Sequence, residues 1–231
     1  MIAGRVAAVR ERIARAAERA GRRPEDVTLV AVSKTHPAEL VASAFAAGLR
    51  DFGENKVQEA EQKLGPLAEL RARGLRWHLI GHLQSNKAKK AAQIFDVVHS
   101  LDGAEIARKL EHYSATLGRT LEVLVQVDLA GEETKHGADE AHLFPLLEVL
   151  RGMKALRPRG LMVLPPLLED PEALRPYFRR LRELRDQALA QDLLLGGELS
   201  MGMSHDFEVA IEEGATIVRV GTALFGERER G

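Results

Sequence analysis

The chain has 231 residues, of which 45% are hydrophobic and 29% are charged, and its formal net charge is -1. This composition is typical of a globular domain, and the balance of charge excludes an electrostatic case for nucleic acid or an anionic membrane as the main partner. The sequence has no cysteine, which excludes a disulfide framework and a thiolate metal site, and no apolar run reaches the length of a membrane span. We therefore expect a soluble, cytoplasmic protein.

An amphipathic helix is predicted at the start of the chain, over residues 5–23, ended by Gly21 and Pro24. The chain then alternates between apolar, β-branched runs and amphipathic runs, a pattern typical of strands followed by helices. The predicted strands cover residues 27–33, 49–53, 75–81, 96–100, 121–129, 159–165, 198–202 and 216–226. The predicted helices between them cover residues 38–48, 54–74, 84–95, 103–118, 139–152, 171–190 and 205–214.

This regular alternation indicates a parallel sheet with helices outside it. Eight strand–helix units in a chain of this length favour an α/β fold of the closed (β/α)8 TIM-barrel type, with the extra helix at its N-terminus. No linker rich in Gly, Pro or Ser divides the sequence, so residues 1–231 are predicted to form a single domain. The alternative is an open, doubly wound sheet.

A lysine at the end of the first predicted strand stands out in the sequence. Residues 29–37 (LVAVSKTHP) place Lys34 directly after an apolar run, and the carboxyl ends of the strands carry the chemistry of a parallel barrel. Partial desolvation there would disfavour the ammonium form of Lys34 and make a nucleophilic amine available. An ordinary surface lysine at a strand end is the alternative, and Lys34 by itself favours that simpler explanation.

The loops after the last two predicted strands indicate an anion site. Residues 200–204 (SMGMS) and 219–226 (RVGTALFG) combine glycines with hydroxyl groups, at the place where this fold often binds phosphate. Two ordinary tight turns are the alternative. Arg219, two residues before Gly221, points either to a ligand or to an internal carboxylate such as Glu198, and the residues alone favour the ion pair.

Two further segments carry polar groups that the predicted barrel would bring to its mouth. Residues 78–82 (HLIGH) hold two histidines, but this stretch is predicted as a strand leading to a turn and has no third ligand nearby, so we do not predict zinc there. His82 is expected instead as a stacking or hydrogen-bonding neighbour of a ligand. Residues 128–137 (DLAGEETKHG) form a long polar loop, either a lid or a solvated connection.

Six segments together make the chain resemble the pyridoxal-phosphate homeostasis proteins, the PROSC or YggS-like family, from the first helix to the C-terminus. They are residues 31–37 (AVSKTHP), 52–59 (FGENKVQE), 77–87 (WHLIGHLQSNK), 160–166 (GLMVLPP), 200–214 (SMGMSHDFEVAIEEG) and 218–228 (VRVGTALFGER). The family fold resembles the N-terminal barrel of bacterial alanine racemases without their β-rich second domain. The chain departs from the family at Asp128, where the family often has Asn.

The resemblance implies pyridoxal 5'-phosphate as the cofactor and assigns residues to it. Lys34 would form a Schiff base with the cofactor, and Arg219 would face its pyridine nitrogen. Ser204, Gly221 and Thr222 would hold the phosphate. The other predicted cofactor-binding residues line the ring or stand at strand ends beside it: Asn55, His82, Met162 and Ser200.

The resemblance also implies a function, a carrier or regulator of vitamin B6 that is not an enzyme. One alternative is a cofactor-dependent amino-acid racemase, which needs two bases. In related racemases the second base is a tyrosine from a second domain, whereas Tyr113 and Tyr177 here lie in predicted outer helices. Another alternative is a class I aldolase that uses Lys34 directly and is colourless as isolated. We expect a monomer with apo-enzymes as candidate transient partners, and neither nucleic acid nor membrane as partner.

Overall fold

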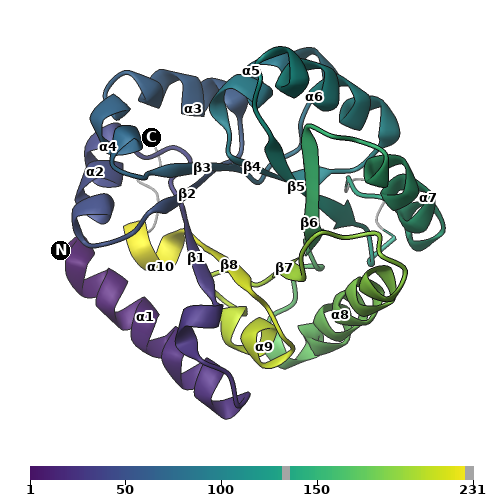
Figure 1. Cartoon of the computed structure of the whole chain (residues 1–231). Coiled ribbons are helices and arrows are strands. Elements are labelled where there is room, and N and C mark those ends of the chain that lie inside the picture. The colour runs from purple at the N-terminus through teal and green to yellow at the C-terminus, as the bar shows by residue number, and fades with distance from the viewer. Residues whose placement is uncertain (132–135, 227–231) are drawn as a thin grey trace.

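The computed structural model describes residues 1–131 and 136–226 of the chain. Its eight strands form a closed parallel barrel in the order β1 to β8, with helices around it (Figure 1). The strands are β1 (Thr28–Val32), β2 (Asp51–Glu54), β3 (Arg76–Leu79), β4 (Val97–Leu101), β5 (Leu121–Val127), β6 (Leu156–Val163), β7 (Glu198–Ser200) and β8 (Ile217–Val220). The predicted barrel is confirmed, and the alternative of an open sheet is wrong.

The helices follow the predicted order, except that one predicted helix is divided in two and a short helix follows the last strand. They are α1 (Ile2–Arg19), α2 (Ala38–Ala46), α3 (Val57–Leu64), α4 (Ala68–Ala72), α5 (Ala88–Ile94), α6 (Ala104–Thr116), α7 (Glu140–Arg151), α8 (Arg175–Ala190), α9 (Phe207–Glu212) and α10 (Thr222–Phe225), with 3-10 turns at Pro24–Asp26, Ser85–Lys87 and Pro171–Leu174. The single helix predicted over residues 54–74 is two helices, because Pro66 cannot donate a helical hydrogen bond. The strand predicted over residues 216–226 ends at Val220, where α10 follows.

The apolar residues form two separate cores. The larger one lies between the strands and the helices, and its largest fully buried side chains include Trp77, Phe52, Phe95, Phe178 and Phe207. The smaller one consists of Val30, Leu124, Met162 and Ile217. Other buried positions of the strands carry polar side chains, among them His78, His99, Ser200 and Arg219. A buried polar group is tolerated only with hydrogen-bond partners, so these side chains must bond to one another.

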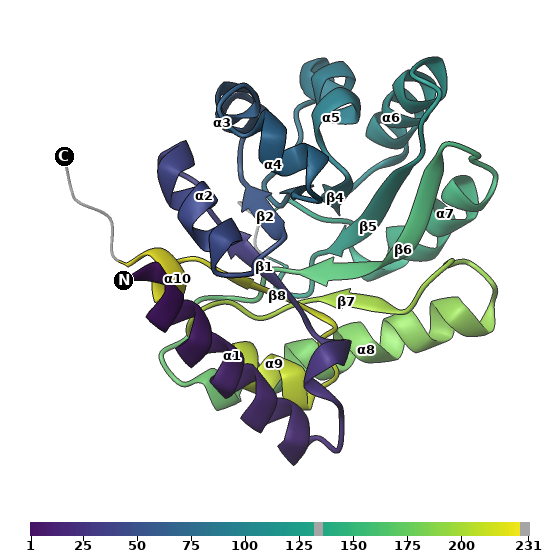
Figure 2. The same cartoon turned by 60° about the vertical axis from the view of Figure 1, so that its left-hand side comes forward.

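Helix α1 packs along α9 and α10 on the outside of the barrel (Figure 2). Its buried apolar stripe faces the larger core and consists of Val6, Val9, Ile13, Ala16 and Ala17. Two ion pairs join its polar flank to α9, Arg12 to Glu208 at 2.6 Å and Arg19 to Glu212 at 2.8 Å. Within the part of the chain that the structure describes, neither α1 nor any other helix is long and apolar enough to cross a membrane.

A cluster of arginines on α8 surrounds one buried carboxylate at the end of α9. Arg175, Arg179 and Arg182 place nitrogens 3.2, 3.1 and 3.1 Å from the carboxylate of Glu213, whose side chain is only 6% exposed. Burial alone raises the pKa of Glu213, but the bonds from Arg179 and Arg175 outweigh burial and the net pKa is lowered. The cluster therefore stabilises the contact between α8 and α9 while Glu213 is ionised.

Replacing Glu213 with Gln should lower the free energy of unfolding by about 1–2 kcal/mol at neutral pH, since charge-assisted bonds are lost. The lowered pKa of Glu213 means that its contribution is present above the unfolded-state pKa near 4.5 and is lost as the pH falls through the folded-state value. Chemical denaturation across acid and neutral pH should show the two proteins converging in acid. The control is Glu183→Gln, which removes an exposed pair with Arg180 and should cost less than about 1 kcal/mol. A deficit that is the same at every pH would contradict this account.

Candidate cofactor site

Lys34 lies half-buried in the turn that follows β1, at the C-terminal end of the barrel. The Ser33 amide donates to the carbonyl of Gly53 at 3.0 Å, so pairing with β2 continues one residue past β1. The turn is closed by the His36 amide, which donates to the Ser33 carbonyl at 3.1 Å. Thr35 has a φ of 66°, a left-handed conformation that a β-branched residue rarely adopts. Such backbone strain persists only where the surroundings hold it in place.

A buried ion pair beneath the turn supplies that support. Lys63 Nζ donates to Glu54 Oε1 at 2.6 Å and to the Ser33 carbonyl at 2.8 Å, and Ser33 Oγ donates to the same Glu54 oxygen at 2.7 Å. The Thr35 amide donates to Glu59 Oε2 at 3.1 Å. Burial raises the pKa of Glu54, against the opposing bonds from Lys63 and Ser33. The residues on either side of Lys34 are therefore tied to β2 and α3.

The predicted anion site brings a hydroxyl and two backbone amides together. Ser204 Oγ accepts hydrogen bonds from the amides of Gly221 and Ala223, both at 3.3 Å, at the start of α10. The loop that carries Ser204 depends on Gly202, which has a φ of +93°. A Cβ at Gly202 would lie 2.7 Å from the Cβ of Ala210, so only glycine lets this loop approach α9 so closely. This arrangement offers N–H and O–H donors of the kind that a phosphate group accepts.

A chain of hydrogen bonds crosses the barrel interior and ends at Arg219. Arg219 donates from Nη1 to Ser200 Oγ at 2.6 Å and from Nη2 to the carbonyl of the last residue of β6 at 2.9 Å. Ser200 Oγ lies 2.8 Å from His99 Nδ1, and His99 Nε2 lies 2.9 Å from His78 Nδ1. His78 Nε2 lies 2.9 Å from Asp51 Oδ1. Five side chains from five strands thus form one continuous network.

The charges of the two ends give this network a direction. Burial alone raises the pKa of Asp51, but the bond from His78 and the charges of His78 and Arg76 outweigh it and the net pKa is lowered. Burial, with the nearby charges of His78 and Arg219, holds the pKa of His99 well below its usual range. When Asp51 is ionised and both histidine rings are neutral, His78 donates to Asp51 and His99 donates to His78. Ser200 then donates its proton to His99 and accepts from Arg219, which can only donate.

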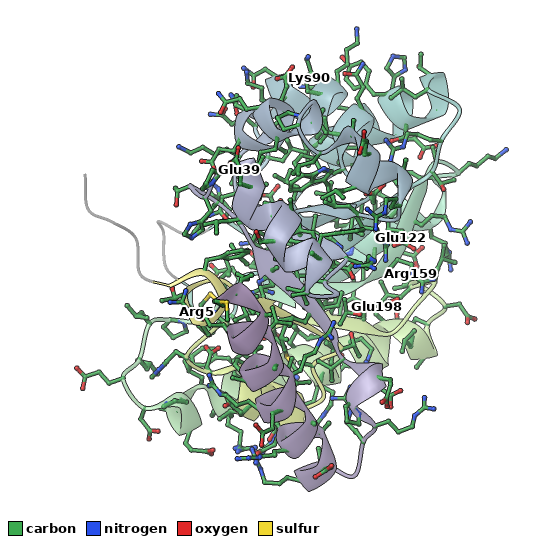
Figure 3. All side chains as sticks on the ribbon, turned by 90° about the vertical axis from the view of Figure 1, so that its left-hand side faces the viewer. Arg5, Glu39, Lys90, Glu122, Arg159 and Glu198 are labelled. Atoms are coloured by element: carbon green, nitrogen blue, oxygen red, sulfur yellow. The ribbon has the colours of Figure 1, made fainter. Side chains whose placement is uncertain are left out.

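Arg219 is buried, yet it remains a cation. Burial lowers the pKa of Arg219 to about 10, opposed by the charge of Asp206, so the guanidinium stays protonated at neutral pH. The predicted ion pair with Glu198 is wrong. Glu198 begins β7, at the opposite end of the barrel, and pairs with Arg159 at 2.6 Å. Figure 3 shows Arg159 and Glu198 together with Glu122, which lies 3.8 Å from Arg159.

The remaining predicted site residues lie at or just after the C-terminal ends of their strands. Asn55 is half-buried after β2, Thr222 is exposed at the start of α10, and Met162 is buried in the smaller core, in register with Ser200. His82, after β3, has a side chain that is 37% exposed. The structure joins Ser200 to Arg219 and Ser204 to Gly221 by hydrogen bonds.

Asp128 has a local role that a carboxylate can fill. Its Oδ1 accepts hydrogen bonds from the amides of Ala130 at 3.0 Å and Gly131 at 3.1 Å. Both bonds need only an acceptor, so Asp serves at this position as well as the oxygen of Asn would. The long polar loop predicted over residues 128–137 lies partly outside the described residues, which omit 132–135.

Sequence reasoning did not include the supporting residues Asp51, Lys63, His78 and His99 in the site. Lys63 stands four residues after Glu59 on α3, a spacing typical of an exposed ion pair. His78 lies between Trp77 and Leu79, and His99 follows Val97 and Val98. A polar residue beside buried apolar residues was the available signal. Their partners lie on other strands, however, and spacing along the chain does not reveal them.

Comparisons with known proteins agree with this geometry. Residues 5–229 match the family model described as alanine racemase, N-terminal domain. A protein of Pseudomonas aeruginosa is 48% identical over 231 residues, which cover 100% of this chain and 97% of the relative. A protein of Aquifex aeolicus is 46% identical over 225 residues, or 97% of each chain. Both relatives are named pyridoxal phosphate homeostasis protein. The chain therefore belongs to the alanine racemase N-terminal domain family and, within it, to the pyridoxal phosphate homeostasis proteins.

Solved structures extend the comparison. PipY of Synechococcus elongatus with pyridoxal phosphate (PLP) bound superposes with a TM-score of 0.87 at 41% identity, covering 98% of this chain and 100% of PipY. PipY without PLP gives a TM-score of 0.88 at 42% identity. Alanine racemase of Corynebacterium glutamicum gives 0.67 at 17% identity, covering 97% of this chain and 62% of the racemase, and this likeness shows the fold alone.

Replacing Lys63 with Met should leave the Glu54 carboxylate buried without its cation and lower the free energy of unfolding by about 3 kcal/mol at neutral pH. Adding Glu54→Gln to Lys63→Met should restore most of this loss, because the buried charge is then gone. Denaturant titration measures both changes. Lys90→Met, which removes an exposed pair with Glu61, is the matched control and should cost less than about 1 kcal/mol. A double variant no more stable than Lys63→Met would show that the charge of Glu54 is not the cause.

Proposed function

We propose that this chain binds pyridoxal 5'-phosphate through Lys34 at the C-terminal end of the barrel and serves in the homeostasis of that cofactor, as a carrier or regulator rather than an enzyme. The observation that carries the proposal is the likeness to PipY with PLP bound, which extends over 98% of this chain at 41% identity. The names of the curated relatives support the role in homeostasis.

The residues at the barrel mouth fit the chemistry of this cofactor. Pyridoxal 5'-phosphate supplies an aldehyde that condenses with amines and a ring that withdraws electrons from the product. Lys34 offers an amine on a turn that Glu54 and Lys63 hold in place. The backbone around Lys34 is therefore already ordered before a ligand binds. The donors around Ser204 and Gly221 suit the phosphate, whose charge-assisted bonds are stronger than bonds between neutral groups.

Arg219 would limit what a bound ring can do. A protonated pyridine nitrogen makes the ring a strong electron sink, and a carboxylate partner favours that form. Arg219 is a cation that only donates hydrogen bonds, and the chain through Ser200 and His99 orients it. Facing the ring nitrogen, Arg219 would favour the unprotonated ring and disfavour reactions that need the electron sink.

The positions of the two tyrosines support a carrier over a racemase, because neither lies where a racemase would need its second base. Tyr113 lies in α6 and Tyr177 in α8, both on the outside of the barrel, as the sequence predicts. A racemase needs a second base on the opposite face of its substrate, and neither tyrosine is placed for that role. Racemase activity is the alternative function.

Borohydride reduction of the PLP-loaded protein should fix a phosphopyridoxyl group on Lys34, because Lys34 follows β1, which pairs with β8, and the proposed phosphate donors around Gly221 follow β8. The visible absorbance of the loaded protein should vanish on reduction, and peptide mass spectrometry should find the adduct on Lys34. Lys34→Ala should abolish the visible band. Lys56→Ala, which removes an exposed lysine two residues after β2, should leave it unchanged.

An adduct mainly on another lysine would overturn the assignment of Lys34 without overturning PLP binding. A colourless protein that takes up no PLP would overturn the proposed function itself and favour a direct Schiff-base aldolase. Robust racemisation of alanine by the loaded wild type would replace the carrier role with the racemase alternative.

A further inference from the structure

Three potential metal ligands meet at the barrel mouth. His82, Asp102 and His136 come from the segments after β3, β4 and β5. His82 Nδ1 lies 3.3 Å from Asp102 Oδ2, and the rings of His82 and His136 stack at 3.5 Å between centroids with an angle of 12°. One ligand atom of each residue lies within 4.8 Å of the other two. The sequence offered no third ligand near the histidine pair at 78 and 82, because the two partners of His82 are distant along the chain.

The assigned cofactor residues do not explain this group. The family resemblance assigns only His82 to the cofactor and gives no role to Asp102 or His136. The side chains of His82 and Asp102 are 37% and 20% exposed, so the group is open to solvent yet partly enclosed. His78 takes no part, because both its ring nitrogens bond within the buried chain to Asp51 and His99.

The backbone holds the three ligands at fixed points. His82 follows Gly81, where a Cβ would lie 2.3 Å from the carbonyl oxygen of Asn55, so this turn packs directly on the end of β2. Asp102 directly follows β4. The carbonyl of His136 accepts a hydrogen bond from Gln126, and two residues later the chain bridges back to the end of β5. The backbone positions of the three residues are therefore fixed, and the stacked rings of His82 and His136 must turn out of their stack before a nitrogen of each can point at one ion.

The distances suit a small transition-metal ion. Zinc binds imidazole nitrogen and carboxylate oxygen at about 2.0–2.2 Å, which places two tetrahedral ligand atoms about 3.4 Å apart. The 3.3 Å between His82 Nδ1 and Asp102 Oδ2 is already at that spacing. His136 lies within reach through rotation of an exposed side chain. Two imidazoles and one carboxylate form a ligand set that divalent transition metals favour.

We propose that His82, Asp102 and His136 bind a divalent transition-metal ion, with Zn²⁺ as the fitting example, and leave one coordination position to water or to another ligand. A set of three protein ligands with an open position is the arrangement of sites in which zinc takes part in chemistry rather than only in structure. The inference rests on these three side chains alone and does not depend on the proposed function.

The test is equilibrium dialysis of Zn²⁺ against the untagged full-length chain, in a buffer free of phosphate, after chelator treatment. The wild type should bind one equivalent of Zn²⁺ with saturation. His82→Ala, Asp102→Asn and His136→Ala should each weaken this binding at least about tenfold, since even groups around metal ligands have effects of that size. His142→Ala is the matched control. His142 Nδ1 lies 2.7 Å from Asp139 Oδ1, but this pair belongs to no group of three potential ligands within the described residues.

X-ray absorption at the zinc edge gives a second measurement that does not depend on whether the variants fold. The zinc-loaded wild type should show two imidazole nitrogens among the zinc ligands, each about 2 Å from the ion, as in other zinc sites of proteins. Failure of the wild type to bind one equivalent of zinc with saturation would overturn the proposal. An affinity that is unchanged in all three variants would also overturn it, and so would a spectrum without imidazole ligands.

Discussion

The hydrogen-bonded chain from Asp51 to Arg219 is the constraint on which the barrel interior depends. Each histidine in it needs one donor and one acceptor, and leaving any of them without a partner would cost about 1–3 kcal/mol. Strands β4, β7 and β8 must therefore keep the positions that bring Ser200 within 2.8 Å of His99 and 2.6 Å of Arg219. The result is a rigidly oriented cation near the C-terminal end of the barrel, where the apolar layer around Met162 gives way to the mouth.

The two ends of the barrel separate structural charges from charges that can meet a ligand. At the N-terminal end, Arg159 neutralises Glu198, so this acid takes no part in the environment of Arg219. At the C-terminal end, the buried pair of Glu54 and Lys63 supports the strained turn that carries Lys34. Burial raises the cost of disturbing the pair of Glu54 and Lys63, since removing one partner leaves an unpaired charge.

The barrel could be predicted from the sequence because strand and helix periodicity are local properties. The position of Lys34 just after a strand could be predicted for the same reason. Boundaries were less accurate where proline acts, as Pro66 does between α3 and α4. The support of the site could not be predicted in this way. His99 and Ser200 are 101 residues apart, and the partners of His82 lie on two other loops. Only closure of the barrel brings such residues together, and the Arg219–Glu198 pair failed as a prediction because the two lie toward opposite ends of neighbouring strands.

We propose that Arg219, oriented by the buried chain, would keep the pyridine nitrogen of a bound cofactor unprotonated. The direct measurement is the ¹⁵N NMR shift of ring-labelled pyridoxal 5'-phosphate on the protein at neutral pH. The account predicts the shift of an unprotonated ring in the wild type and of a protonated ring in an Arg219→Glu variant that retains the cofactor. A protonated ring in the wild type, or the same shift in both proteins, would contradict it.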